Sequence, residues 1–146
     1  MAADRPTARW LVDGITVRGA RPDGWWRDRR AAMRRLTAGL DALAEQTGDP
    51  VTVVFDGAPH DIPAERVDVR FASRRGPNAA DDDIAALAAG DDDPRSLRVV
   101  TSDGALADQV SAAGAEVVGA GAFRRRLDEL GGAGEDRGRG GRSSAP

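Results

Sequence analysis

The chain has 146 residues, 40% of them hydrophobic and 31% charged, with a formal net charge of −3. That length favours one domain with a single core, and the lack of cysteine excludes disulfides, thiolate catalysis and zinc–sulfur sites. All basic residues are arginine, which excludes mechanisms that need a catalytic lysine. The small negative charge argues against bulk attraction to nucleic acid, although not against a local basic patch.

Neither a secretory signal nor a membrane-spanning segment is expected from the sequence. Residues 1–7 are expected to form a flexible end and contain no apolar segment typical of a secretory signal. No apolar run approaches the roughly 20 residues that cross a bilayer. We therefore expect an intracellular, cytoplasmic protein with no membrane partner.

Short apolar runs alternate with helical periodicity along most of the chain. In chain order the patterns predict a strand at 9–17, a helix at 28–46, strands at 51–57 and 67–73, a helix at 79–90, a strand at 97–102, a helix at 103–114, a strand at 115–120 and a helix at 121–130. This alternation predicts an α/β sandwich with a mainly parallel central sheet over residues 8–130. Residues 131–146 are rich in Gly, Arg and Ser and are expected to form a disordered tail.

Three of the predicted strands end on an aspartate. Asp13 ends "RWLVD", Asp56 follows "VTVVF", and Asp103 follows "LRVVTS". Because sites in parallel sheets form beyond the carboxyl ends of the strands, these side chains are expected at one edge of the sheet. The predicted helix at 79–90 opens with three further acids, Asp81, Asp82 and Asp83.

Carboxylates gathered at one edge would repel each other and raise one another's pKa values. A hard divalent cation, Mg²⁺ or Mn²⁺, would relieve that repulsion and could activate a water for attack on a phosphodiester. The same residues also have ordinary structural explanations. The "VDGI" stretch fits a tight hairpin turn, Asp103 fits a helix N-cap, and acids in a first helical turn complement the helix dipole.

The ordered series "LVDGITV", "RPDGWWRDR", "VTVVFDG", "VRFASRRGPNAADDDI", "VVTSDGALADQV" and "VVGAGAF" resembles the YacP-like NYN domain, a branch of the PIN-like nuclease superfamily. The resemblance covers about residues 9–128. It implies a three-layer Rossmann-like (PIN-like) sandwich and a Mg²⁺- or Mn²⁺-dependent endoribonuclease. It also implies catalytic roles for Asp13, Asp56, Asp81 and Asp103, and metal-ligand roles for Asp13, Asp81, Asp82 and Asp103.

Two departures from known patterns bear on function. The family usually has asparagine three positions after its first aspartate, where this chain has Thr16, which lacks the amide donors. That change leaves open a non-catalytic RNA-binding or adaptor domain with a weakened site. "VDGIT" also faintly resembles the first motif of haloacid-dehalogenase phosphatases, but Ile15 stands where that motif needs a second aspartate.

The remaining candidate residues concern RNA, which is expected to be single-stranded and could be ribosome-associated. Arg74 and Arg75 could hold RNA phosphates, although both could equally be solvated surface residues. Trp25 and Trp26 are expected to pack a loop, with base stacking as the alternative. The sequence does not indicate an oligomeric state.

Four polar residues have roles that the sequence defines less sharply. Asn78 is expected to cap the helix at 79–90. Thr101 and Ser102 could bind a metal-bound water or a phosphate at the end of their strand. His60, with no second histidine in the chain, is assigned no metal role.

Overall fold

The computed structural model describes residues 8–14, 29–74, 76 and 78–130. Its strands are β1 (Arg9–Asp13), β2 (Val51–Phe55), β3 (Asp68–Phe71), β4 (Leu97–Val100) and β5 (Glu116–Val118). Its helices are α2 (Arg29–Thr47), α3 (Ala79–Ala89), the short 3₁₀ helix η2 (Pro94–Ser96), α4 (Gly104–Ala112) and a C-terminal helix over residues 120–130. The predicted N-terminal end at 1–7 and the tail at 131–146 lie outside the described residues and stay predictions.

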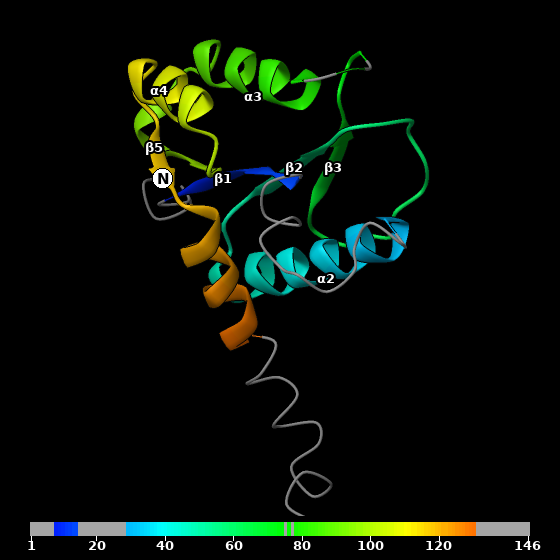
Figure 1. Cartoon of the computed structure of the whole chain (residues 1–146). Helices are drawn as coiled ribbons and strands as arrows, with labels where there is room; N and C mark the ends of the chain where they lie inside the picture. The colour runs from blue at the N-terminus through cyan, green and yellow to red at the C-terminus, as the bar shows by residue number, and fades with distance from the viewer. Residues whose placement is uncertain (1–7, 15–28, 75, 77, 131–146) are drawn as a thin grey trace, which may run out of the picture.

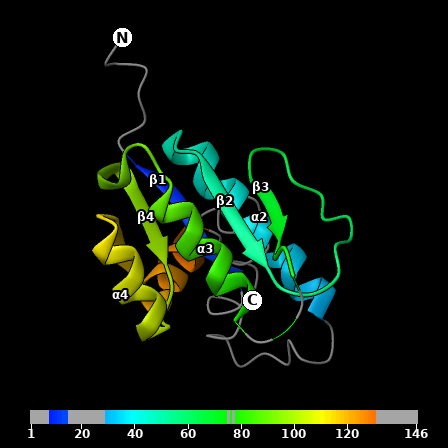
Figure 2. The same ribbon diagram turned by 90° about the horizontal axis from the view of Figure 1, so that it is seen from above.

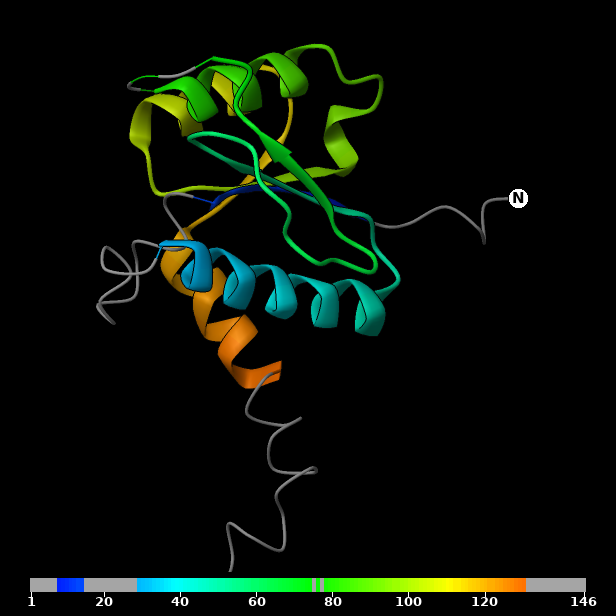
Figure 3. The same ribbon diagram turned by 90° about the vertical axis from the view of Figure 1, so that its right-hand side faces the viewer.

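The five strands form one sheet in the order β3-β2-β1-β4-β5, and every neighbouring pair is parallel. Helices α3 and α4 lie on one face, while α2 and the C-terminal helix lie on the other (Figures 1 and 3). This is the three-layer, Rossmann-like α/β sandwich that the sequence predicts. Within the described part of the chain, no helix combines the length and apolar character needed to span a membrane.

The sheet is apolar on both faces because both faces are covered. Trp10 and Val12 pack into the cluster under α2, whereas Leu11 packs into the cluster under α3 and α4. The apolar side chains that recur at helical spacing along α2 face the sheet and are at most 4% exposed: Met33, Leu36, Leu40 and Leu43. Strand β3 lies to the side of α3 (Figure 2), and its alternating exposure confirms a partly exposed edge strand.

Each predicted strand runs at least two residues too far at its carboxyl end. The largest difference is in the first, predicted at 9–17: β1 ends at Asp13, and Gly14 already has helical backbone. The hairpin explanation of "VDGI" is wrong for β1, because β2 and β4 occupy both of its edges. The residues just past the strands belong instead to the loops that carry the candidate site.

Gly14 lies where the chain leaves the sheet against a closely packed neighbour. A Cβ at this position would be 2.5 Å from Phe55 Cδ1 and 3.0 Å from the backbone oxygen of Val54. We expect Gly14→Ala to lower the free energy of unfolding by about 1–3 kcal/mol, because the Phe55 ring is fully buried and has little room to move.

Urea denaturation would measure this change, with Gly39→Ala as the matched control. A Cβ on Gly39 would sit 3.8 Å from Leu127 Cδ1, which is an ordinary contact, inside helix α2. That substitution is expected to stabilise the protein by about 0.5–1 kcal/mol. A Gly14→Ala protein as stable as the parent would contradict the close-packing argument.

Candidate active site

Three of the predicted aspartates lie where β1, β4 and α3 meet at the carboxyl edge of the sheet. Asp13 is the last residue of β1, Asp103 immediately precedes α4, and Asp81 lies in the first turn of α3. All strands are parallel, so their carboxyl ends share this edge. Helices α3 and α4 cover the same face, which brings their N-terminal ends over the end of β1.

Asp13 is held by a neighbouring hydroxyl. Its side chain is 1% exposed, and the Thr101 hydroxyl donates a hydrogen bond to its Oδ2 at 2.9 Å. The same Thr101 oxygen accepts a hydrogen bond from the Asp103 backbone N–H at 3.0 Å. Thr101 therefore links the two strand-terminal aspartates, and its hydroxyl proton is directed at Asp13 rather than at a solvent-facing ligand.

Asp103 is a helix N-cap, as the sequence predicts. Its Oδ1 accepts the Leu106 backbone N–H at 2.9 Å, and its backbone is extended just before α4. No residue in the described part of the chain donates a hydrogen bond to its other oxygen, Oδ2. The capping role therefore fixes the position of the carboxylate without using both of its oxygens.

The ionised form of Asp81 is disfavoured by its surroundings, including the neighbouring acids. Its pKa is raised to about 6, chiefly because burial disfavours the charged form and then because of the negative charges of Asp13, Asp103 and Asp82. Carboxylates that repel in this way are a common feature of functional sites. The structure therefore brings Asp13, Asp82 and Asp103 within electrostatic reach of Asp81.

Asp82 also faces a cation. It forms an ion pair with Arg74, and both side chains are at least half exposed. The pair places a guanidinium beside the acidic cluster, at the position predicted for RNA phosphates. It also competes with the predicted ligand role of Asp82, which stays a prediction. Arg75 lies outside the described residues, as do Trp25, Trp26 and Thr16.

Asp56 occupies the same edge but a different position. It follows β2 directly, and Val54, two residues before it, is in register with Asp13. It is partly buried, and its charge is not among those that raise the pKa of Asp81. Its predicted catalytic role therefore has no electrostatic support comparable to that of Asp13 and Asp103, and it stays a prediction.

The oxygen-only donors suit a hard cation such as Mg²⁺ or Mn²⁺. Among the residues that the structure describes, however, no three histidine, cysteine, aspartate or glutamate side chains are grouped closely enough to hold a metal ion. The two findings agree, because charges interact over longer distances than those of coordination bonds. Mg²⁺ is usually bound through one or two carboxylates and several waters, which this arrangement permits.

One polar residue differs from its predicted role, and two others make contacts that the sequence did not indicate. Asn78 occupies the N-cap position of α3 with a φ of 62°, but its side chain makes no capping hydrogen bond. Ser102 accepts the Ala120 backbone N–H at 3.1 Å and so anchors the start of the C-terminal helix. Asp83, considered only as a helix-dipole residue, accepts hydrogen bonds from the Ser73 backbone N–H and hydroxyl at 2.6 and 2.8 Å.

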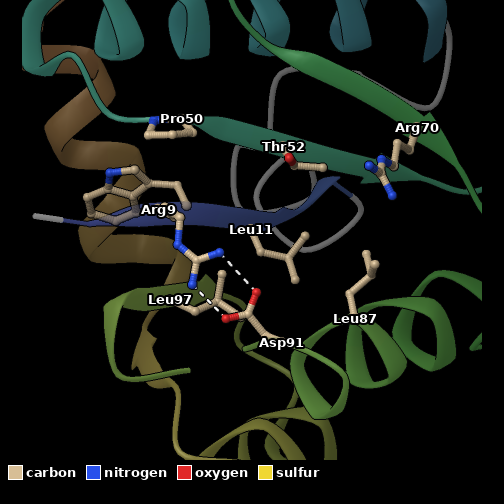
Figure 4. A pocket seen from close by; sticks show the side chains of 9 residues that line it. Arg9, Leu11, Pro50, Thr52, Arg70, Leu87, Asp91 and Leu97 are labelled. Carbon is tan, nitrogen blue, oxygen red and sulfur yellow. Dashed lines mark hydrogen bonds and ion pairs between the residues drawn. The ribbon is translucent and has the colours of Figure 1, made fainter. Parts of the chain in front are cut away.

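A pocket of about 230 Å³ lies at the opposite edge, at the amino ends of the strands (Figure 4). Both arginines that line it are ion-paired, Arg9 with Asp91 at 2.6 Å and Arg70 with Asp68 at 2.9 Å. The hydrogen bond from Arg9 lowers the pKa of Asp91. The paired charges of Arg9 and Asp91 thus lie at the amino edge, whereas the charges that disfavour ionised Asp81 lie at the carboxyl edge.

Comparisons with known proteins agree with this arrangement. The family model of the YacP-like NYN domain matches residues 11–139. A mutant of Rae1 (YacP) from Bacillus subtilis has a crystal structure that is similar with a TM-score of 0.74 and 27% identity, over 94% of this chain and 86% of that one. A further structure, of Rae1 (YacP) itself, matches with a TM-score of 0.72 and 27% identity, over 94% and 83%.

No curated protein sequence matches the chain significantly. The family match nevertheless covers most of the chain, and the fold and the order of the strand-terminal acids are consistent with it. The chain belongs to the YacP-like NYN domain family, which is RNA-related and typically nuclease-like.

Proposed function

We propose that this protein is a metal-dependent endoribonuclease that hydrolyses phosphodiester bonds of single-stranded RNA at the carboxyl edge of the sheet. The observation that supports this most is the raised pKa of Asp81, caused by burial and by the charges of Asp13, Asp103 and Asp82. Such charge accumulation is unfavourable in the protein alone and becomes favourable when a cation binds.

In this proposal the acidic residues would bind the metal ion and the arginines would bind the RNA. Asp13 and Asp103 have fixed carboxylates, through Thr101 and through the capping bond to α4. With Asp81, and with Asp82 and Asp56 at the rim, they would hold Mg²⁺ or Mn²⁺. When bound, the cation supplies charge neutralisation and Lewis-acid activation of the attacking water. Arg74, and Arg75 beside it, would contact RNA phosphates.

The first test is the metal requirement. We expect cleavage of mixed cellular RNA in Mn²⁺ or Mg²⁺, no cleavage in EDTA, and full recovery when excess Mn²⁺ is added back. Gel analysis of the products over time would measure this. If the protein cleaves RNA equally well in EDTA, the proposed chemistry is wrong.

A second candidate is a non-catalytic RNA-binding or adaptor domain. Two observations favour it: Thr16 replaces the asparagine usual in the family, and no ready-made cluster of three ligands is present among the described residues. This candidate predicts RNA binding that EDTA leaves unchanged, together with no cleavage by the purified protein. In either case RNA associated with cytoplasmic ribosomes is a reasonable first substrate to try.

A further inference from the structure

A shallow pocket of about 430 Å³ lies beside β3, between this edge strand and the loop that follows β2. It is lined by Pro59, His60, Asp61, Ile62, Val69 and Phe71. Residues 59–62 come from the loop, whereas Val69 and Phe71 come from β3. The pocket is therefore built from two segments that both begin or end at the carboxyl edge of β2 and β3.

The walls of this pocket combine the polar side chains of His60 and Asp61 with apolar and aromatic ones. The His60 ring lies with its centroid 5.2 Å from that of Phe71, at an interplanar angle of 60°. Phe71 in turn lies 6.0 Å from the buried ring of Phe55. Because Ile62, Val69 and Phe71 are only partly buried against the core, they leave apolar surface facing the pocket.

The loop is held in place by a carboxylate from another element. Asp41, on helix α2, accepts three backbone N–H groups, from Glu65 at 3.1 Å, Arg66 at 2.9 Å and Val67 at 3.0 Å. Pro59 and Pro63 restrict the backbone further. These contacts fix the end of the loop where it enters β3, next to the pocket-lining Val69 and Phe71.

The pocket lies near the same carboxyl edge of the sheet as the acidic cluster, but on the opposite face. Asp13 is in register with Val54, and Phe55, the next residue, is in register with Phe71. Phe71 is thus two strands away from β1, a lateral distance of about 10 Å at the usual spacing of strands. Val54 packs under α3 and α4, whereas Phe55 and Phe71 pack on the α2 face, so Asp13 and the pocket lie on opposite faces of the sheet. An RNA strand with a phosphate at the acids would therefore have to pass around the carboxyl edge of the sheet before one of its bases reached the pocket.

We propose that this pocket binds an unpaired nucleobase of the RNA, an inference that rests on the proposed function. Unpaired bases are recognised by stacking on aromatic and histidine side chains. No arginine lines the pocket among the described residues, and Asp61 contributes a carboxylate, so a base fits it better than a phosphate does. Asp61 also offers an acceptor for the exocyclic amino group of a base.

A first experiment uses the fact that His60 is the only histidine in the chain, so its ring protons give unambiguous NMR signals. The full-length Asp81→Asn protein, which should not cleave, is titrated with a single-stranded RNA decamer and separately with inorganic polyphosphate. We expect the decamer to shift the His60 ring signals by ring-current effects and polyphosphate to leave them nearly unchanged. Equal shifts from both would overturn the proposal, because they would report charge rather than a base.

A second experiment locates the base. In the same Asp81→Asn background, a single abasic nucleotide is moved along the decamer. We expect one position at which its introduction weakens binding by about 5- to 150-fold. His60→Ala should weaken binding of the intact decamer by a similar factor and should remove the penalty at that position, whereas His60→Phe should keep both affinity and penalty.

The proposal fails if His60→Ala binds the intact decamer as tightly as its parent, or if the abasic penalty persists in it. Melting temperatures of the variants establish that each is folded. Failure of the proposed function would look different: RNA would bind with the dependence on His60 described above, but the wild-type protein would not cleave it. Conversely, metal-dependent cleavage with no effect of His60→Ala on binding would refute only the base pocket.

Discussion

Replacing Asp81 with asparagine is expected to abolish RNA cleavage and, at the same time, to stabilise the fold. Asparagine keeps the shape of the side chain and removes the charge that burial and Asp13, Asp103 and Asp82 all disfavour. Loss of that charge should lower the cleavage rate by at least about 100-fold, because the site then holds a cation poorly. A change that lowers activity and raises stability is a signature of a functional site.

The gain in stability should depend on pH in a defined direction. The pKa of Asp81 is about 6 in the folded protein, compared with an ordinary value of 3.8. The folded state therefore binds more protons than the unfolded state between these values, so this contribution to stability is complete below pH 3.8 and is lost as the pH rises through 6. Asparagine does not titrate, so the advantage of the variant should be near zero at low pH and largest above neutrality.

Urea denaturation at several pH values would measure this difference. Because Asp81 is partly exposed, solvent screening limits the expected advantage to about 1 kcal/mol above neutrality. Mn²⁺ should raise the melting temperature of the parent at pH 8 and have little effect on Asp81→Asn. If the variant is the less stable protein at pH 8, the charges do not repel as the structure indicates.

Asp83→Asn is the matched control, two residues further along the same helix. Its carboxylate is already satisfied by two hydrogen bonds from Ser73. We therefore expect this substitution to lower stability and to leave cleavage largely intact, the reverse of Asp81→Asn. Equal effects of the two substitutions on cleavage would mean that the N-terminal turn of α3 acts as a whole rather than through Asp81.

Much of this site could be predicted from sequence because its signals are local. A parallel strand covered on both faces is a short apolar run, and the residue that ends it is easily recognised. Asp13 and Asp103 follow from that pattern, and Asp81 follows from the acidic start of a helix. The parallel order of the strands then brings them to one edge.

The remaining features depend on contacts between residues far apart in the chain. The hydroxyl of Thr101 binds a carboxylate 88 positions away, and the carboxylate of Asp41 binds backbone groups 24 to 26 positions away. A hydroxyl at a strand end has many possible partners, and only the packing of β1 against β4 selects Asp13. The predicted strands extend beyond the observed carboxyl ends for the same reason, since tertiary contacts decide where the pairing of strands stops.

A substitution of Thr101 is expected to have the second large effect on RNA cleavage. We expect Thr101→Val, which keeps the shape of the side chain and removes the hydroxyl, to lower cleavage by about 10- to 100-fold. Asp13 is 1% exposed and would lose this donor, while the Asp103 N–H would lose its acceptor. Leaving such buried groups without these partners should also lower the free energy of unfolding by about 1–3 kcal/mol.

A readout other than stability separates positioning of the site from general support of the fold. If Thr101 positions Asp13 and Asp103, Thr101→Val should raise the Mn²⁺ concentration needed for half-maximal cleavage, because the Asp13 carboxylate loses an orienting donor and the Asp103 backbone loses its acceptor. Thr101→Ser restores the hydroxyl without the methyl group and should return the Mn²⁺ dependence close to that of the parent. A valine variant that is destabilised but has an unchanged Mn²⁺ midpoint would show that Thr101 only supports packing. The two hydrogen bonds of its hydroxyl favour the positioning role, because they link the carboxylate of Asp13, at the end of β1, to the backbone of Asp103, just before α4.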